Sequence, residues 1–280
     1  MEILGMSGMS LWRVALAIGG LGLFLALEAR YAFTRSPVSR LFRGVTNITL
    51  GVGNAIIVRL LFSGFLFSLA QTIAAREIGI LNRVDLPLVL EFLIAVALLD
   101  FGTYVLHVLY HRVPPLWRIH RIHHSDPVFD VTTAVRFHPV EIILSMIFRI
   151  GFVITLGVSG AAIALFEMTL LFASQFQHSD LRLPDRIDSR IRWIWVTPNM
   201  HRIHHSVKFE ELDSNYSTIF TWWDRLLGTY RADVRQESIR VGLSGYTGPV
   251  RLTLMALLMM PLGPLGKRET LRSRGDAVAQ

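Results

Sequence analysis

The chain has 280 residues, 52% of them hydrophobic, and its mean hydropathy of +0.45 is typical of a membrane protein with several spans rather than of a soluble domain. Its net charge is +7, but the sequence has no Lys/Arg stripe with interleaved aromatic residues, which argues against nucleic-acid binding. The absence of cysteine excludes disulfides, thiolate nucleophiles and cysteine-ligated iron–sulfur clusters within this chain.

Two apolar segments begin the chain. Residues 11–29 predict a retained membrane span, because no small-residue cleavage site follows them. The next segment is basic and lacks acidic residues, so the positive-inside rule predicts that it is cytoplasmic; its arginines are Arg30, Arg35, Arg40 and Arg43. A second span is predicted over residues 45–74. It carries polar side chains that should face protein or the membrane interface rather than lipid, namely Asn47, Asn54 and Arg59.

The third predicted span, residues 87–109, returns to the cytoplasm and ends close to His107 and His111. Asp100 lies seven residues, about two helical turns, before His107 and therefore on the same helix face. A carboxylate in that position is expected to orient a metal-binding histidine. The pair Pro114-Pro115 ends this helix, and the polar residues 116–138 that follow are expected to stay on the cytoplasmic side.

Residues 139–177 are almost wholly apolar and far longer than the roughly 20 residues that one crossing needs. Gly157, Ser159 and Gly160 lie near the middle, so a helical hairpin is predicted that returns His178 to the cytoplasmic side. Residues 252–262 predict a short amphipathic helix on the membrane surface, followed by a loose charged tail after Lys267.

These segments together predict an all-α integral membrane protein. It should have about four to five transmembrane helices and a cytosolic, histidine-rich helical cap. We expect three parts: N-terminal transmembrane helices in 1–86, a catalytic domain in 87–235, and an amphipathic segment with a tail in 236–280.

The histidines are concentrated in three motifs. HRIHHS occurs at 120–125 and again at 201–206, and HVLYH occupies 107–111. Residues at i, i+3 and i+4 share a helix face, so each H-x-x-H-H is predicted to direct three rings at one point. The eight clustered histidines exceed what one ion can bind, which favours a two-metal centre; they are His107, His111, His120, His123, His124, His201, His204 and His205. Spans counted from the arginine segment place all three motifs and His178 on one membrane face.

Several catalytic and nucleotide-binding motifs are absent, which narrows the reactions that the sequence predicts. The sequence has no H-E-x-x-H, no G-x-S-x-G, no P-loop and no G-x-G-x-x-G. A nitrogen-rich pair of metals beside apolar helices suits oxygen activation near a lipid chain. The spacing leaves open a metal-dependent lipid hydrolase and a non-catalytic membrane metal-binding protein, such as a transporter or assembly factor. Transport is disfavoured, because the histidines lie at or beyond the ends of the spans rather than at the bilayer midplane.

An ordered set of motifs resembles the fatty acid hydroxylase/sterol desaturase superfamily of membrane non-haem di-iron enzymes over residues 90–232. The set is HVLYH, HRIHHSD, RFHPVE, FQHSD, PNMHRIHHS, DSNYS and WDRLLGTY. The resemblance implies two iron ions, O2 as co-substrate, and hydroxylation or desaturation of a membrane lipid such as a sterol or fatty acyl chain. Sphingolipids, ornithine lipids and carotenoid precursors also remain open as substrates.

The resemblance also implies a ligand set and its supporting residues. The expected ligands are His107, His111, His120, His123, His124, His178, His201, His204 and His205, and no catalytic residue is expected beyond the metal centre. Some hydroxylases of this superfamily have another histidine where this chain has Ser174, and His138, which is structural by pattern alone, is a possible replacement. Supporting roles are expected for Asp100, Asp126, Asn199, Asn215 and Asp224, and interfacial anchoring for Trp222, Trp223 and Tyr230.

The source of electrons must lie outside this sequence, because it contains no flavin or nicotinamide fingerprint. A ferredoxin, or a b-type cytochrome with its reductase, is therefore the expected donor. Arginine outnumbers lysine by 26 to 2, and no retrieval signal is present. Both features favour a bacterial inner membrane, with the active site facing the cytoplasm.

Overall fold

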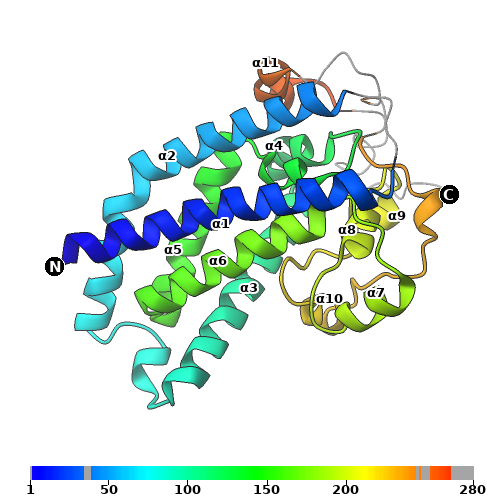
Figure 1. The fold of residues 1–280 in the computed structure, drawn as a ribbon. Coiled ribbons are helices and arrows are strands. Elements are labelled where there is room, and N and C mark those ends of the chain that lie inside the picture. The colour runs from blue at the N-terminus through cyan, green and yellow to red at the C-terminus, as the bar shows by residue number, and fades with distance from the viewer. Residues whose placement is uncertain (1, 35–38, 244–245, 247–252, 266–280) are drawn as a thin grey trace.

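A computed structural model describes residues 2–34, 39–243, 246 and 253–265. Five long helices dominate it: α1 (Glu2–Tyr31), α2 (Arg40–Ala75), α3 (Leu88–Arg112), α5 (Pro139–Leu156) and α6 (Gly160–His178). Figure 1 shows α1 and α6 running side by side, with α7, α8, α9 and α10 gathered beyond one end of the long helices. The described residues contain isolated β-bridges but no strand, so the predicted all-α class is confirmed.

Short helices form the cap at that end. They are α4 (Pro114–His124), α7 (Asp185–Ile191), α8 (Pro198–His204), α9 (Phe209–Leu212), α10 (Trp222–Leu226) and α11 (Leu254–Met259), with the 3-10 turns η2 (Val131–Val135), η3 (Gln236–Ser238) and η5 (Met260–Leu262). A further 3-10 turn, η1 (Leu81–Arg83), lies at the opposite end of the long helices, beside the turn between α5 and α6. Prolines and polar caps set where they begin: Pro114 occupies the first turn of α4, and the Thr197 side chain accepts a hydrogen bond from the Met200 amide at the start of α8.

Four helices of the described residues are long and apolar enough to cross a membrane. The candidate spans are Trp12–Tyr31, Arg40–Phe62, Leu88–Arg112 and Pro139–Leu156. This number agrees with the lower end of the predicted range. The second span begins at Arg40 rather than at residue 45, so part of the predicted basic loop is the first turn of α2.

The apolar run from residue 139 folds as the predicted hairpin. Helix α5 ends at Leu156, Gly157 adopts a left-handed conformation with φ of 74°, and the Ser159 side chain caps α6. The turn packs against the chain between α2 and η1, where a Cβ on Gly157 would lie 2.4 Å from the Ile78 carbonyl oxygen. Glycine is therefore required at this turn both by its φ angle and by the close approach of another backbone segment.

Helix α2 is tied to the cap by buried polar groups. Arg43 donates to Asp126 (2.7 Å) and pairs with Asp130, and the Asn47 amide also donates to Asp126 (3.0 Å). Arg136 donates to the Asn47 side-chain oxygen (2.8 Å). Burial by itself would raise the pKa of Asp126, but Arg43 and Arg136 outweigh it and lower the pKa. Asn47 thus faces protein, as expected, and it contributes to the position of the cap.

The C-terminal segment packs on the protein through one side. Leu257 of α11 is buried with Leu50 and Ile122, whereas Met255 and Met259 are exposed. Arg118 donates to the carbonyl oxygens of Pro261 and Gly263 at 3.1 and 2.9 Å. The described helix therefore buries one side and exposes apolar methionines on the other, so its amphipathic character stays a prediction, and the tail after Lys267 lies outside the described residues.

Candidate metal centre

Four helix ends deliver nine histidine rings to one region of the cap. His107 and His111 lie one turn apart at the end of α3, and α4 follows after the break at Val113. His120, His123 and His124 lie on α4, His178 is the last residue of α6, His201 and His204 lie on α8, and His205 follows α8 directly. The proline pair at 114–115 turns α4 back across the end of α3, so the first two motifs meet in space.

The rings divide into two groups. The first is His107, His111, His120, His124 and His204, and the second is His123, His178, His201 and His205. Within each group the nitrogen atoms that could bind a metal lie within 4.8 Å of one another. The structure thus brings together all nine residues expected as ligands and arranges them as two adjacent sites, one with five histidines and one with four.

Each H-x-x-H-H motif is shared between the two groups, so the prediction that one motif directs three rings at a single point is wrong. The first copy contributes His120 and His124 to the five-histidine group and His123 to the other. The second copy contributes His204 to the five-histidine group and the remaining two to the other. Adjacent residues on a helix point about 100° apart, so two neighbouring histidines cannot face the same ion.

The orientation of the rings directs their Nε2 atoms inward. The Nδ1 atoms of His107, His178 and His204 lie 2.7 Å from the carbonyl oxygens of Tyr216, Ser174 and Ser214, respectively. A carbonyl oxygen only accepts hydrogen bonds, so each of these Nδ1 atoms carries the proton and its Nε2 atom keeps a lone pair.

The facing Nε2 atoms are separated by 2.9 Å for His178 and His201 and by 3.0 Å for His107 and His204. In the second pair both Nδ1 atoms donate to carbonyl oxygens, so the two lone pairs face each other and repel unless a cation lies between them. The donor set is wholly imidazole, which suits zinc, copper, iron and nickel. The residues present therefore fit a pair of transition-metal ions.

Burial favours the neutral form of four cap histidines. It lowers the pKa of His123, His124, His201 and His205 well below the usual 6.5, and neighbouring imidazoles lower it further. A neutral ring is the form that binds a metal, so no proton has to leave these four residues at neutral pH.

A carboxylate that sequence reasoning did not single out contacts one ligand ring. Glu141 lies in the first turn of α5, is 3% exposed, and accepts a hydrogen bond from His120 Nδ1 at 2.6 Å. Such a contact fixes the tautomer of a metal-binding histidine and raises its basicity. The residue is the last of the RFHPVE motif, so the motif contained the signal.

Asp100 does not contact a histidine, which corrects the expectation that it orients His107. Its carboxylate accepts hydrogen bonds from the backbone amides of Ile219 and Phe220 at 3.2 and 3.0 Å and from Trp223 Nε1 at 2.9 Å. Two helical turns separate it from His107 by about 10 Å along the axis, which a short side chain cannot bridge. Asp100 instead fastens residues 219–223 of the cap to the middle of α3.

Two residues expected to support the metal centre, Asp224 and Asn215, form hydrogen bonds with the backbone of the cap. Asp224 accepts from the amides of Tyr216 and Ser217 at 2.8 and 3.0 Å, and so holds the carbonyl that accepts from His107. Burial raises the pKa of Asp224 despite these hydrogen bonds. Asn215, with φ of 54°, joins the Met200 carbonyl of α8 to the backbone of Arg231.

The two remaining supporting candidates contact other parts of the protein. Asp126 joins α2 to the cap, and Asn199 accepts from Arg202 at 3.5 Å and from Gln236 at 3.0 Å. His138 belongs to neither group, so the structure does not support it as an additional ligand. Its Nδ1 atom accepts from the Val140 amide at the start of α5, and its Nε2 atom faces the Leu258 carbonyl.

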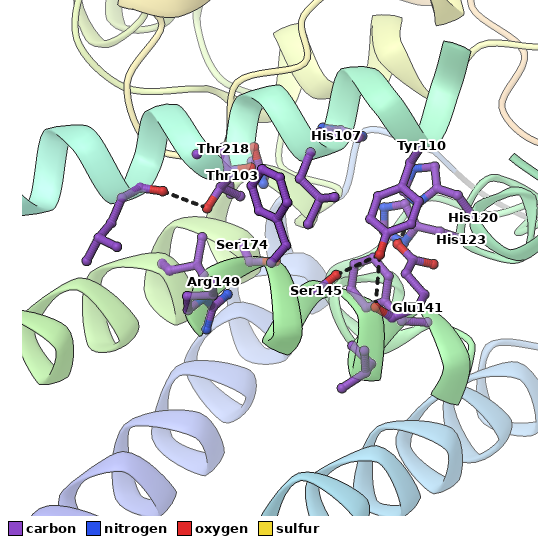
Figure 2. Close-up of a pocket in the computed structure, with 18 of the residues that line it drawn as sticks. Thr103, His107, Tyr110, His120, His123, Glu141, Ser145, Arg149, Ser174 and Thr218 are labelled. Atoms are coloured by element: carbon purple, nitrogen blue, oxygen red, sulfur yellow. Dashed lines mark hydrogen bonds and ion pairs between the residues drawn. The ribbon is translucent and has the colours of Figure 1, made fainter. Parts of the chain in front are cut away.

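A cavity of about 250 Å³ opens beside the histidines between α3, α5 and α6. Five of the nine rings reach it: His107, His120, His123, His178 and His201. Its apolar wall includes Leu99, Leu106, Ile142, Phe148, Phe152 and Leu170. Figure 2 shows Tyr110, Ser145 and Glu141 at the histidine end and Arg149 farther along the cavity. Ser174 also lines the cavity, one helical turn before His178. Ser174, at the position where a further ligand was considered, thus faces the cavity.

Comparisons with known proteins agree with this geometry. Residues 92–229 match the model of a family described as Fatty acid hydroxylase. Ornithine lipid hydroxylase OlsE from Rhizobium tropici is 30% identical over 65% of this chain and 54% of its own length. Alkylglycerol monooxygenase from Homo sapiens is 31% identical over 52% of this chain and 31% of its own length. Cholesterol 25-hydroxylase from Rattus norvegicus is 27% identical over 64% of this chain and 60% of its own length. The chain thus spans roughly a third to somewhat over half of these relatives. No solved structure matches it.

Proposed function

Because residues 92–229 of this chain belong to the fatty acid hydroxylase family, we propose that it is a membrane enzyme that hydroxylates a C–H bond of a membrane lipid with O2 at two iron ions. The observation that carries the proposal is the position of nine convergent histidines at the end of a mainly apolar cavity. The relatives are named as hydroxylases or a monooxygenase, which favours hydroxylation over desaturation.

The five-histidine and four-histidine groups would each hold one iron ion. The bound pair would supply the oxidising power: one oxygen atom of O2 enters the C–H bond, and two electrons and two protons convert the other to water. Glu141 holds the proton of His120 on Nδ1, and the carbonyls of Ser174, Ser214 and Tyr216 do the same for three more rings. These contacts keep the rings directed at the metal positions before the substrate arrives.

Side chains around the histidines exclude water from the reaction. Phe137 stacks on the His123 ring at a centroid distance of 4.4 Å, and Phe129 packs near His178 and His205. The apolar wall of the cavity would hold the alkyl part of a lipid next to the rings that face it. A dry site of this kind limits the loss of oxidising equivalents to water.

The electrons would come from a separate protein, for which a ferredoxin or a b-type cytochrome with its reductase is the proposed class. We further propose that the chain resides in a bacterial inner membrane with the cap on the cytoplasmic side. The four candidate spans and the arginines that follow the first of them support this orientation.

Metal content and O2 uptake of the detergent-purified protein test the proposal. We expect two irons per chain and O2 uptake that requires both reductant and lipid. The double variant His204→Ala, His205→Ala removes one ring from each group and should lose both the metals and the uptake. The control His138→Ala removes a histidine outside both groups and should keep the metals.

Two zinc ions with no uptake would first require reconstitution with iron, because zinc can replace iron during purification. If the iron-loaded protein also failed to consume O2 under any reductant, oxygenation would be wrong. The metal-dependent lipid hydrolase would then be tested by release of fatty acid from the same lipids.

A further inference from the structure

The cavity contains one arginine, at the end away from the metal centre. Arg149 lies on α5 eight residues after Glu141, so the Cα atoms of the two residues are about 12 Å apart along the helix. Figure 2 shows Arg149 well removed from His120 and His123. Charged side chains within membrane helices are costly, face cavities or protein, and frequently mark a substrate path.

The neighbours of Arg149 do not neutralise it. Glu167 of α6 pairs closely with Arg13 of α1, at 2.6 Å, whereas its other oxygen lies 3.5 Å from Arg149. A charge-assisted hydrogen bond is normally about 2.7–2.9 Å, so the second contact is weak. Two guanidinium groups thus share one carboxylate, and the three side chains carry a net charge of +1.

A purely structural role accounts poorly for this arrangement. Glu167 of α6 already has a close partner in Arg13 of α1, so Arg149 of α5 is a second arginine on one glutamate. The side chain of Arg149 keeps 23% of its surface exposed, and it lines the cavity. A hydrocarbon tail placed there would leave the charge without compensation, so the occupant must bring an anionic group of its own.

We propose that Arg149 binds an anionic oxygen group of the lipid substrate, a carboxylate or a phosphate, and thereby sets which carbon reaches the metal centre. The inference rests on the proposed function, because the occupant of the cavity is taken to be the substrate of that reaction. The anionic group lies at Arg149, and the alkyl segment extends past Phe148 and Ile142 toward the histidines.

Three variants separate this role from a structural one. Arg149→Met removes the net charge and leaves the close Arg13–Glu167 pair intact, so it should fold. Glu167→Gln removes the carboxylate that competes for Arg149. Arg59→Met is the matched control, because Arg59 is an exposed arginine of α2 that does not line the cavity.

Equilibrium binding of radiolabelled laurate, dodecyl phosphate and dodecanol is measured on metal-free protein in a neutral maltoside detergent. The metal-free protein is used so that no anion can bind to a metal. The unmodified chain should bind laurate or dodecyl phosphate about tenfold more tightly than dodecanol, and Arg149→Met should abolish that preference. Glu167→Gln should increase it, and Arg59→Met should leave it unchanged. The tighter of the two anions identifies the carboxylate or the phosphate as the natural group.

Equal binding of the three probes by the unmodified chain would overturn the inference, as would an anion preference that survives in Arg149→Met. If that variant loses its thermal transition, Arg149→Lys takes its place, since it keeps the charge and should keep part of the preference. The binding measurement uses neither metal nor O2, so its outcome does not depend on whether the protein consumes O2. In the same way, a lack of anion preference would not change the outcome of the O2-uptake test.

Discussion

Single residues decide which nitrogen of each histidine faces the metal positions. His107, His178 and His204 donate from Nδ1 to backbone carbonyls, whereas His120 donates to the buried carboxylate of Glu141. A carbonyl is supplied by any residue, so three of these contacts do not depend on side-chain identity. The fourth depends on one side chain, which makes Glu141 the most informative residue to replace.

Replacing Glu141 with Ala should weaken metal binding by about 10-fold to 100-fold, because the orientation and tautomer of His120 are then no longer fixed. Glu141→Gln should weaken it less, since the amide oxygen still accepts from Nδ1. Metal occupancy is measured by elemental analysis after dialysis against a graded chelator. Glu210→Ala, at an exposed position of α9, serves as the control. Full occupancy of Glu141→Ala at every chelator concentration would contradict the role.

At the scale of helices, the α5–α6 hairpin determines the position of His178. The turn at Gly157 sets where α6 begins, and α6 ends on His178. The turn is held from outside by the chain between α2 and η1, where Gly79 with φ of 100° lies against Gly157. A change at this turn is therefore made at the opposite end of α6 from the histidines.

Gly157→Ala should destabilise the protein by at least about 1–2 kcal/mol, the typical penalty for a non-glycine residue in a left-handed conformation. The clash with the Ile78 carbonyl oxygen adds to that penalty. The measurement is the midpoint of thermal unfolding in detergent. Gly160→Ala is the matched control, because a Cβ there meets no atom within 4 Å and the residue lies in the first turn of α6. Equal midpoints for both variants would show that the turn is not strained.

At the scale of the whole molecule, the N-terminal helices contribute polar groups to the cap as well as spans. Glu28 of α1 accepts from the backbone amides of Val131 and Asp180, both at 2.8 Å. Arg43 of α2 holds Asp126 and Asp130. The cap is thus held by α1 and α2 as well as by α3, and its histidines are buried. Their burial makes the stability of the whole protein sensitive to pH.

The metal-free protein should lose stability as the pH falls below about 6.5. The pKa values of His123, His124, His201 and His205 are below 6.5 in the folded state, so the unfolded chain binds more protons between the two values. Each pH unit in that window costs about 1.4 kcal/mol per histidine that stays neutral.

The unfolding midpoint of the metal-free protein in detergent should therefore be nearly constant above pH 7 and decrease steadily from pH 6.5 downward. Metal-loaded protein should show the same direction with a steeper loss, because protons then compete with the ions for the rings. A midpoint that is equal at pH 7.5 and pH 5.5 would mean that these histidines are not buried as neutral groups.

Much of the fold could be predicted from local patterns. Apolar runs longer than about 20 residues specify membrane helices whatever surrounds them, and the central glycines of residues 139–177 specify a hairpin. The spacing of HVLYH and of the two HRIHHS copies placed eight of the nine rings, and the span count placed His178 with them. These features depend on the helical period and on hydropathy, which are properties of short stretches of chain.

The tertiary structure alone decided how the nine rings divide into five and four, because that depends on how α3, α4, α6 and α8 cross. It also decided that Glu141, rather than Asp100, contacts a ligand ring, that His138 caps α5, and that Arg149 lies in the cavity. Local spacing states which residues share a helix face. It does not state which face of another helix lies opposite, because that is set by packing between residues far apart in the chain.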